Sequence, residues 1–238
     1  TNTQGAAIYN ENGSATISTT EFTNNTATFD GAAYYGNHAT GTITSSTMDG
    51  NHGEDGAAIL LYDNSSLTLD DVDITNNVAT GWGGGVFALA TSSVTIQNGT
   101  LIDGNTAAAG GGIALGTTGT GTVTNSTISN NQANNGGGVY SQGALTVTSS
   151  TVDHNTASVG GGGIFHASAS GTTTTGSTLS NNSATNNGGA LTNNGAGLVT
   201  ITGSTITGNT STFGAGVNVF DARTIEISGS TFSDNHAT

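Results

Sequence analysis

The sequence predicts a right-handed parallel β-helix, and three observations support this fold. First, an asparagine returns nine times at intervals of 24 to 28 residues, and the same pattern of neighbours returns with it. Second, apolar residues stand at fixed distances before each asparagine, often with the spacing of two that is typical of strands. Third, no segment has a helical period of useful length, and proline is absent. Right-handedness is expected from the usual hand of crossovers between parallel strands.

The repeat length also predicts the domain organisation. A period of about 26 residues is typical of stacked units that bury their apolar faces only against each other. We therefore expect residues 1–238 to form a single domain of about nine rungs, with continuous repeats and no caps. At a rung spacing of ~4.8 Å, nine rungs make a rod of roughly 43 Å.

Two apolar positions in each repeat are expected to point into the coil. One lies three residues before the asparagine: Phe22, Met48, Ile74, Ile102, Ile128, Val152, Leu179, Ile206 and Phe232. The other lies five residues earlier: Ile17, Ile43, Leu69, Val123, Val147, Ile201 and Ile227. An interval of five would place the two positions on opposite faces of a straight strand, so a corner must separate them. Small polar residues and glycine occupy that corner, as in Ser45-Ser46 and Gly203-Ser204.

A cluster of glycine and alanine precedes another strand in each repeat, as in Gly110-Gly111-Gly112-Ile113. Small residues permit close backbone approach and unusual dihedral angles at a tight corner. Each rung is thus predicted to contain about three short strands and three corners. The rung that holds Thr174 should be the weakest, because threonine replaces an apolar residue there.

The recurring asparagines are expected to stack along the rod, with their side-chain amides bonded up and down as in cross-β assemblies. We interpret them as a structural ladder rather than as ligands for a bound molecule. Its members are Asn25, Asn51, Asn77, Asn105, Asn131, Asn155, Asn182, Asn209 and Asn235.

Composition narrows the range of partners. Fifteen acidic residues against one base, Arg223, give a net charge of −14. Nucleic acid and anionic lipid both require clustered lysine and arginine, so neither is an expected partner. No apolar run approaches membrane-spanning length. The chain opens at Thr1 without a signal segment, which predicts a mature product or an excerpt whose export signal lies elsewhere.

The repeats resemble those of the chlamydial polymorphic membrane proteins and similar bacterial surface proteins, which pair an F-x-x-N element with a G-G-A-[ILV] element. Phe22-Thr23-Asn24-Asn25 and Phe232-Ser233-Asp234-Asn235 match the first element, and Gly188-Gly189-Ala190-Leu191 matches the second. This resemblance implies a secreted or surface-displayed β-helix, often adhesive. Those proteins also carry a membrane barrel at the C-terminus, which this sequence does not contain.

Candidate chemistry is sparse. Many β-helices are polysaccharide lyases or hydrolases, but their carboxylate clusters lie in grooves built from long loops, and the corners here are short. We therefore expect no enzymatic activity, no catalytic residues and no cofactor. The densest acidic group is expected to lie on a solvated face, with a calcium site as the weaker alternative: Asp49, Glu54, Asp55, Asp63, Asp70, Asp71 and Asp73.

The histidines and the arginine are also interpreted as structural. His38, His52, His154, His166 and His236 occupy mixed repeat positions, so we expect surface or corner histidines rather than metal ligands. Arg223 is expected to form a local ion pair with Asp221 or Glu226.

Threonine gives a sharper alternative. On four consecutive rungs the outward neighbours of the inward residue are paired threonines: Thr122 and Thr124, Thr146 and Thr148, Thr173 and Thr175, Thr200 and Thr202. Such an array looks like the flat threonine face of ice-binding β-solenoids. It breaks at Asp70, Gln97 and Glu226, and threonine is common on exposed strands anyway.

The repeat phase at the two ends predicts self-assembly. The sequence stops halfway through a repeat, and its opening supplies the missing half. We therefore expect an extracellular or cell-surface structural protein that stacks head to tail on itself into a filament or stalk. The apolar residues expected at the joint are Ile8, Ile17, Phe22, Ile225, Ile227 and Phe232. The alternatives, in order, are a surface adhesin fragment that binds glycans or host proteins, an ice-binding protein and a carbohydrate-active enzyme.

Overall fold

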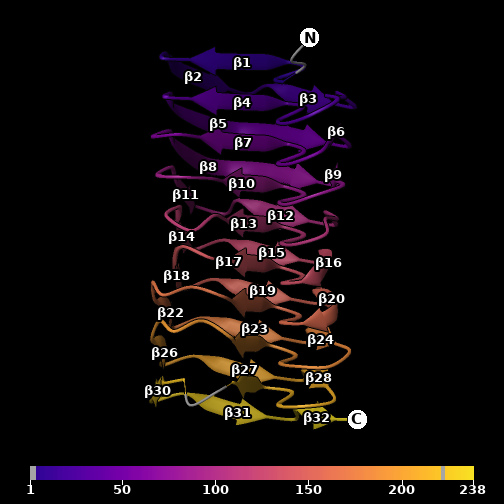
Figure 1. Cartoon of the computed structure of the whole chain (residues 1–238), viewed down its shortest axis with the longest axis vertical. Coiled ribbons are helices and arrows are strands. Elements are labelled where there is room, and N and C mark those ends of the chain that lie inside the picture. The colour runs from indigo at the N-terminus through magenta and orange to yellow at the C-terminus, as the bar shows by residue number, and fades with distance from the viewer. Residues whose placement is uncertain (1–3, 221–222) are drawn as a thin grey trace.

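A computed structural model describes residues 4–220 and 223–238. The regular secondary structure of these residues consists of β-strands, and equivalent strands of successive repeats pair in parallel. Figure 1 shows the turns stacked along one long axis, with the two ends of the chain at opposite ends of the stack. This arrangement is a parallel β-helix, which confirms the predicted fold.

The first sheet follows the glycine and alanine clusters and has nine strands among the described residues. Its strands are β1 (Ile8–Glu11), β4 (Tyr34–Asn37), β7 (Ile59–Tyr62), β10 (Val86–Ala88), β13 (Ile113–Leu115), β17 (Val139–Ser141), β21 (Ile164–His166), β25 (Leu191–Asn193) and β29 (Val217–Val219). Alternate residues face opposite ways: Ile59 and Leu61 lie in the main core, and Leu60 packs in a separate cluster on the outside.

The second sheet holds the two predicted inward positions, on either side of a corner. Strands before the corner are β2 (Ser14–Ser18), β5 (Thr40–Asp49), β8 (Ser66–Thr75), β11 (Ser93–Gln97), β14 (Thr120–Thr124), β18 (Ala144–Thr148), β22 (Thr172–Thr175), β26 (Val199–Thr202) and β30 (Ile225–Ser228). Strands after it are β3 (Glu21–Thr23), β12 (Leu101–Asp103), β15 (Thr127–Ser129), β19 (Thr151–Asp153), β23 (Thr178–Ser180), β27 (Thr205–Thr207) and β31 (Thr231–Ser233). β5 and β8 run through the corner and contribute to both series.

A further series of very short strands follows the asparagines, so the prediction of about three strands per rung was one too few for most rungs. These strands are β6 (His52–Gly53), β9 (Val78–Ala79), β16 (Gln132–Asn135), β20 (Thr156–Gly160), β24 (Ser183–Ala184), β28 (Thr210–Ser211) and β32 (His236–Ala237). Their inward residue is often alanine, such as Ala79, Ala133 and Ala157. Most of these strands have two residues with one small inward side chain, which is too short to show a period in the sequence.

The corners are made by residues with positive φ. The predicted corner between the two inward positions is confirmed, with Ser45 at a φ of 44° and Asn125 at 49°. A second corner falls on the residue just before each ladder asparagine, where Asn, Gly, His and Asp occur because they tolerate the left-handed region best. A third falls on the first glycine of each cluster. At Gly110, a Cβ atom would lie 2.2 Å from the carbonyl oxygen of Ile113.

The core is one continuous column of apolar side chains inside the coil. The inward residues of the middle rungs are fully buried, including Ile74, Ile102 and Ile128 at 0% exposure. The column is open at the last rung, where Ile227 is 47% exposed and Phe232 is 41% exposed.

Candidate functional site

The structure brings the asparagines into one ladder in which each interior amide is fully used. Oδ1 of Asn51 accepts the backbone N–H of Asn25 at 3.0 Å and its side-chain N–H at 2.8 Å. Nδ2 of Asn51 donates to Oδ1 of Asn77 and to the carbonyl oxygen of Phe22, both at 2.9 Å. The pattern repeats to Asn235. Each step therefore satisfies polar groups that would otherwise be buried without partners.

This ladder has a direction. From one asparagine to the next, each donates toward the C-terminal end and accepts from the N-terminal end, while a second side-chain N–H donates back to a carbonyl oxygen of the preceding rung. Among the described residues, no acceptor lies beyond Asn235 for the bonds that its backbone and side chain would donate onward, and no donor reaches Oδ1 of Asn25. The two ends of the rod are thus complementary in hydrogen bonding.

A serine ladder at the corner was missed by the sequence analysis. The backbone N–H of Ser126 donates to Oγ of Ser150 at 3.2 Å, and Ser150 donates in the same way to Ser177. Each hydroxyl in turn donates to a carbonyl oxygen two residues earlier, as Ser150 does to Thr148. The recurrence of serine at the corner was visible in the sequence, but its bond to the next rung was not.

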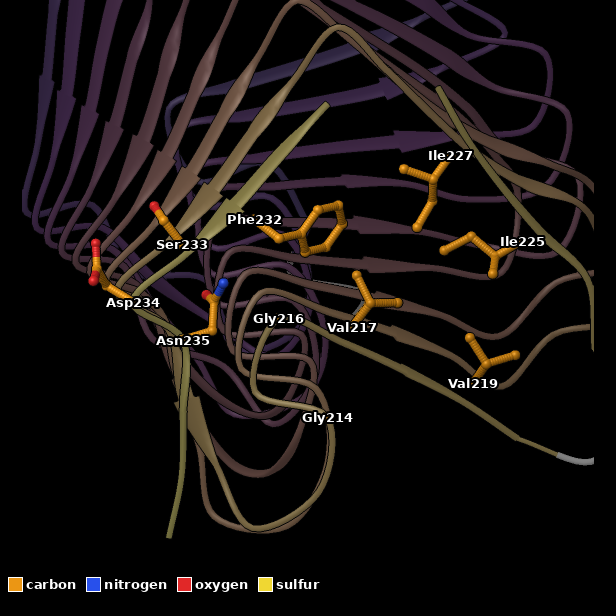
Figure 2. A pocket seen from close by; sticks show the side chains of 10 residues that line it. All are labelled: Gly214, Gly216, Val217, Val219, Ile225, Ile227, Phe232, Ser233, Asp234 and Asn235. Carbon is orange, nitrogen blue, oxygen red and sulfur yellow. The ribbon is translucent and has the colours of Figure 1, made fainter. Parts of the chain in front are cut away.

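The last rung opens into a pocket of about 550 Å³ that exposes the cross-section of the core. Figure 2 shows Val217, Ile225, Ile227 and Phe232 turned toward the space between them, with Asp234 on the outer side. At the other end, Ile8 and Ile17 are half-buried. The expected exposure of Phe22 was wrong: it is 7% exposed, because it lies within the main core cluster with Met48, its partner on the next rung.

A row of aromatic residues on the outer face of the first sheet was also missed. Tyr9 and Tyr35 stack with ring centroids 5.1 Å apart, and Tyr140 and Phe165 stack at 5.5 Å. The row is interrupted at Leu60, which is in register with Tyr35 and Phe87. Each of these residues follows an inward residue by one position, so strand parity could have revealed the row.

A pocket of about 410 Å³ lies where the row is interrupted, and we call it the tyrosine pocket. It is lined by Tyr9, Tyr35, Tyr62, Leu60, Asp30 and Asp55, among others. The pKa of Asp30 and that of Asp55 are raised, chiefly by burial and further by neighbouring carboxylates. Burial, together with the charge of Asp30, also raises the pKa of Tyr35 to about 12.

The other acidic residues do not converge. Asp70 accepts from Gln97 at 2.8 Å, and Asp71 accepts from Ser45 at 3.0 Å. Hydrogen bonds from Thr75 and Asn76 lower the pKa of Asp49. Within the described residues, no group of three or more His, Asp or Glu side chains is arranged to hold a metal ion. Most of these carboxylates are used in bonds between rungs, but Asp55 is half-buried in the tyrosine pocket rather than on a solvated face.

His166 corrects the expectation of surface or corner histidines. Its side chain is fully buried, and burial lowers its pKa. It lies two residues after the inward Ile164, so strand parity turns it into the coil, where its Nδ1 is 2.9 Å from the Thr172 hydroxyl. The other four histidines are exposed, as expected.

The ion pair expected for Arg223 was wrong for Glu226, since the ion pairs between described side chains do not include it. The carboxylate of Glu226 sits on an exposed strand position, and Arg223 is partly buried. The other expected partner, Asp221, lies outside the described residues.

The outer threonine column is longer than the sequence indicated. Strand register places one threonine directly above the next through eight rungs, at Thr16, Thr42, Thr68, Thr95, Thr122, Thr146, Thr173 and Thr200. The corner of the fourth repeat, Asn98-Gly99-Thr100, holds one extra residue, which had hidden Thr95 from this column. The second column is still interrupted at Asp70 and Gln97. Ice binding stays a prediction.

Together, the coil, the ladders and the repeated corners define a β-solenoid repeat protein. A family model described as the right handed beta helix region matches residues 1–152, and the chain belongs to this family. No curated protein and no solved structure matches the chain. The narrower resemblance to chlamydial surface proteins stays a prediction. In the part of the chain that is described, no helix has the length and apolar character needed to cross a membrane.

Proposed function

We propose that this β-helix is a structural protein of the cell surface or extracellular space, and that copies stack head to tail to extend the rod. The observation that carries the proposal is the complementarity of the two end rungs. One end offers donors from Asn235 and an open apolar cross-section at Phe232, and the other offers an acceptor on Asn25. Stacking would pair unsatisfied strand edges and bury Ile227 against a second copy.

The charge of the chain makes this assembly depend on salt. Each copy adds a net charge of −14, so axial contact brings like charges together. Screening by salt, or bridging by divalent cations, should therefore favour assembly. A contact between two different end surfaces does not close on itself and propagates as a fibre.

The test separates stacking of copies from continuation of one chain. The intact mass of the natural protein is measured first, and light scattering of the 238-residue chain then follows with and without salt. Scattering mass that grows with protein concentration and salt is expected. A chain that stays monomeric at high concentration and moderate salt would overturn the proposal. So would a much larger intact mass, because the next rung would then belong to the same chain.

A second candidate function is a surface adhesin that binds glycans or host proteins through its lateral faces. The tyrosine pocket favours it, because a side pocket is not needed for a rod that only spans distance. The two functions are compatible, since one uses the ends of the rod and the other uses its side.

A further inference from the structure

The tyrosine pocket has the form of a missing step in an aromatic stack. The rings of Tyr9 and Tyr35 are nearly parallel, at 6°, and Tyr35 is only 4% exposed because it packs in one cluster with Leu60 of the next rung. On that rung Leu60 is in register with Tyr35, and its side chain is shorter than a tyrosine ring. The pocket therefore offers the exposed rings of Tyr9 and Tyr62 beside a buried apolar floor, with space for a flat group.

The pocket is also negatively charged. Asp30 and Asp55 are half-buried, and their carboxylates raise the free energy of the unoccupied pocket because burial and neighbouring charges both disfavour ionisation. Asp55 accepts the backbone N–H of Trp82 at 2.6 Å, and Asp30 accepts an N–H of Gln4 at 3.3 Å. The one basic residue of the chain, Arg223, precedes β30, at the other end of the coil from this pocket. A cationic ligand would compensate these carboxylates.

The chemistry of the walls selects the kind of cation. Metal ions need several converging oxygen ligands, and no group of three or more acidic or histidine side chains suited to a metal occurs among the described residues. An aromatic face beside two carboxylates instead suits a planar organic cation, which can stack on the ring and donate hydrogen bonds in a fork. We propose that the tyrosine pocket binds the guanidinium group of an arginine presented by a basic partner protein. This goes beyond the structural role, which does not use the side of the rod.

The test titrates an acetyl-Gly-Arg-Gly-amide peptide into the 238-residue chain. The readouts are calorimetry and the fluorescence of Trp82, the single tryptophan, whose backbone contacts Asp55. A citrulline peptide has the same shape without the charge, and a lysine peptide has the charge without the plane. We expect saturable binding of the arginine peptide and roughly tenfold weaker binding of the other two.

Variants locate the site. Asp30→Asn and Asp55→Asn should each weaken arginine binding roughly tenfold. Asp73→Asn removes the same charge from an exposed position on β8 and should leave affinity unchanged. If an aspartate variant does not fold, Tyr62→Ala at the exposed rim supplies the second test and should also weaken binding.

Several results would overturn the proposal. Equal binding of the citrulline or lysine peptide would do so, as would an equal loss of affinity in Asp73→Asn, because the effect would then be general charge attraction. Absence of saturable binding would also overturn it. Displacement of the peptide by a neutral oligosaccharide would assign the pocket to a glycan instead.

Discussion

At the scale of single residues, buried polar groups decide where the coil is weak. Thr174 is fully buried between Val147 and Ile201, and its hydroxyl reaches the carbonyl oxygen of Thr200 at only 3.4 Å. Thr174→Val should therefore raise stability by about 1 kcal/mol, because burial of a methyl group replaces a weak hydrogen bond. Denaturant unfolding checks this. A lower midpoint would mean that the hydroxyl contributes more than its length suggests.

His166 should make the protein sensitive to acid. Burial holds its pKa below the ordinary value of 6.5, so the unfolded chain takes up this proton first as the pH falls. The free energy of unfolding is therefore unaffected by His166 above pH 6.5, and it falls as the pH drops below 6.5. His166→Leu should flatten the pH dependence of the urea midpoint between about pH 7 and about pH 5. The exposed His236→Leu serves as the control, and an equal flattening there would contradict the assignment.

Replacing Asp55 or Asp49 by asparagine should change the melting temperature in opposite directions. The pKa of Asp55 is raised by burial, so its charge opposes folding at neutral pH, and Asp55→Asn should increase the melting temperature. The pKa of Asp49 is lowered by hydrogen bonds, so its contribution is present above pH 3.8 and lost as the pH falls. Asp49→Asn should reduce the melting temperature at neutral pH. A lower melting temperature for Asp55→Asn would contradict the claim that burial disfavours its charge. A higher melting temperature for Asp49→Asn would contradict the claim that its hydrogen bonds stabilise the fold.

At the scale of elements, strand parity governs which substitutions the coil tolerates. Ile128→Asp would bury a charge without a partner and should cost about 3 kcal/mol or more. Thr148→Asp, on an outward position of β18, should change stability by less than about 0.5 kcal/mol. Unfolding by denaturant compares the two. Equal losses would mean that the assigned inner and outer faces are inverted.

Features that recur in every repeat could be predicted from the sequence, whereas features that depend on one local contact could not. The columns of Ile128 and Asn131 were predictable, because every repeat writes the same residue type at the same place. The tyrosine pocket was not, since its residues do not recur from repeat to repeat, and Asp55 accepts a bond there from the backbone of Trp82 on the next rung. His166 is buried against the usual preference of histidine for the surface, because it shares strand parity with the inward Ile164.

At the scale of the whole molecule, the repeat gives the interior rungs nearly the same contacts with their neighbours. The core is continuous from Ile43 to Ile206, so an added rung meets the same chemistry that each internal rung meets. The proposed stacking would therefore need no new type of contact. It would need the repulsion of a net charge of −14 per copy to be screened.

Negative-stain electron microscopy of the 238-residue chain in moderate salt tests the central claim most directly. One copy should be a rod of roughly 43 Å, set by nine rungs at ~4.8 Å. Head-to-tail stacking predicts rods of constant width whose lengths are multiples of that unit and grow with protein concentration. Single short rods at every concentration and salt level would contradict the claim.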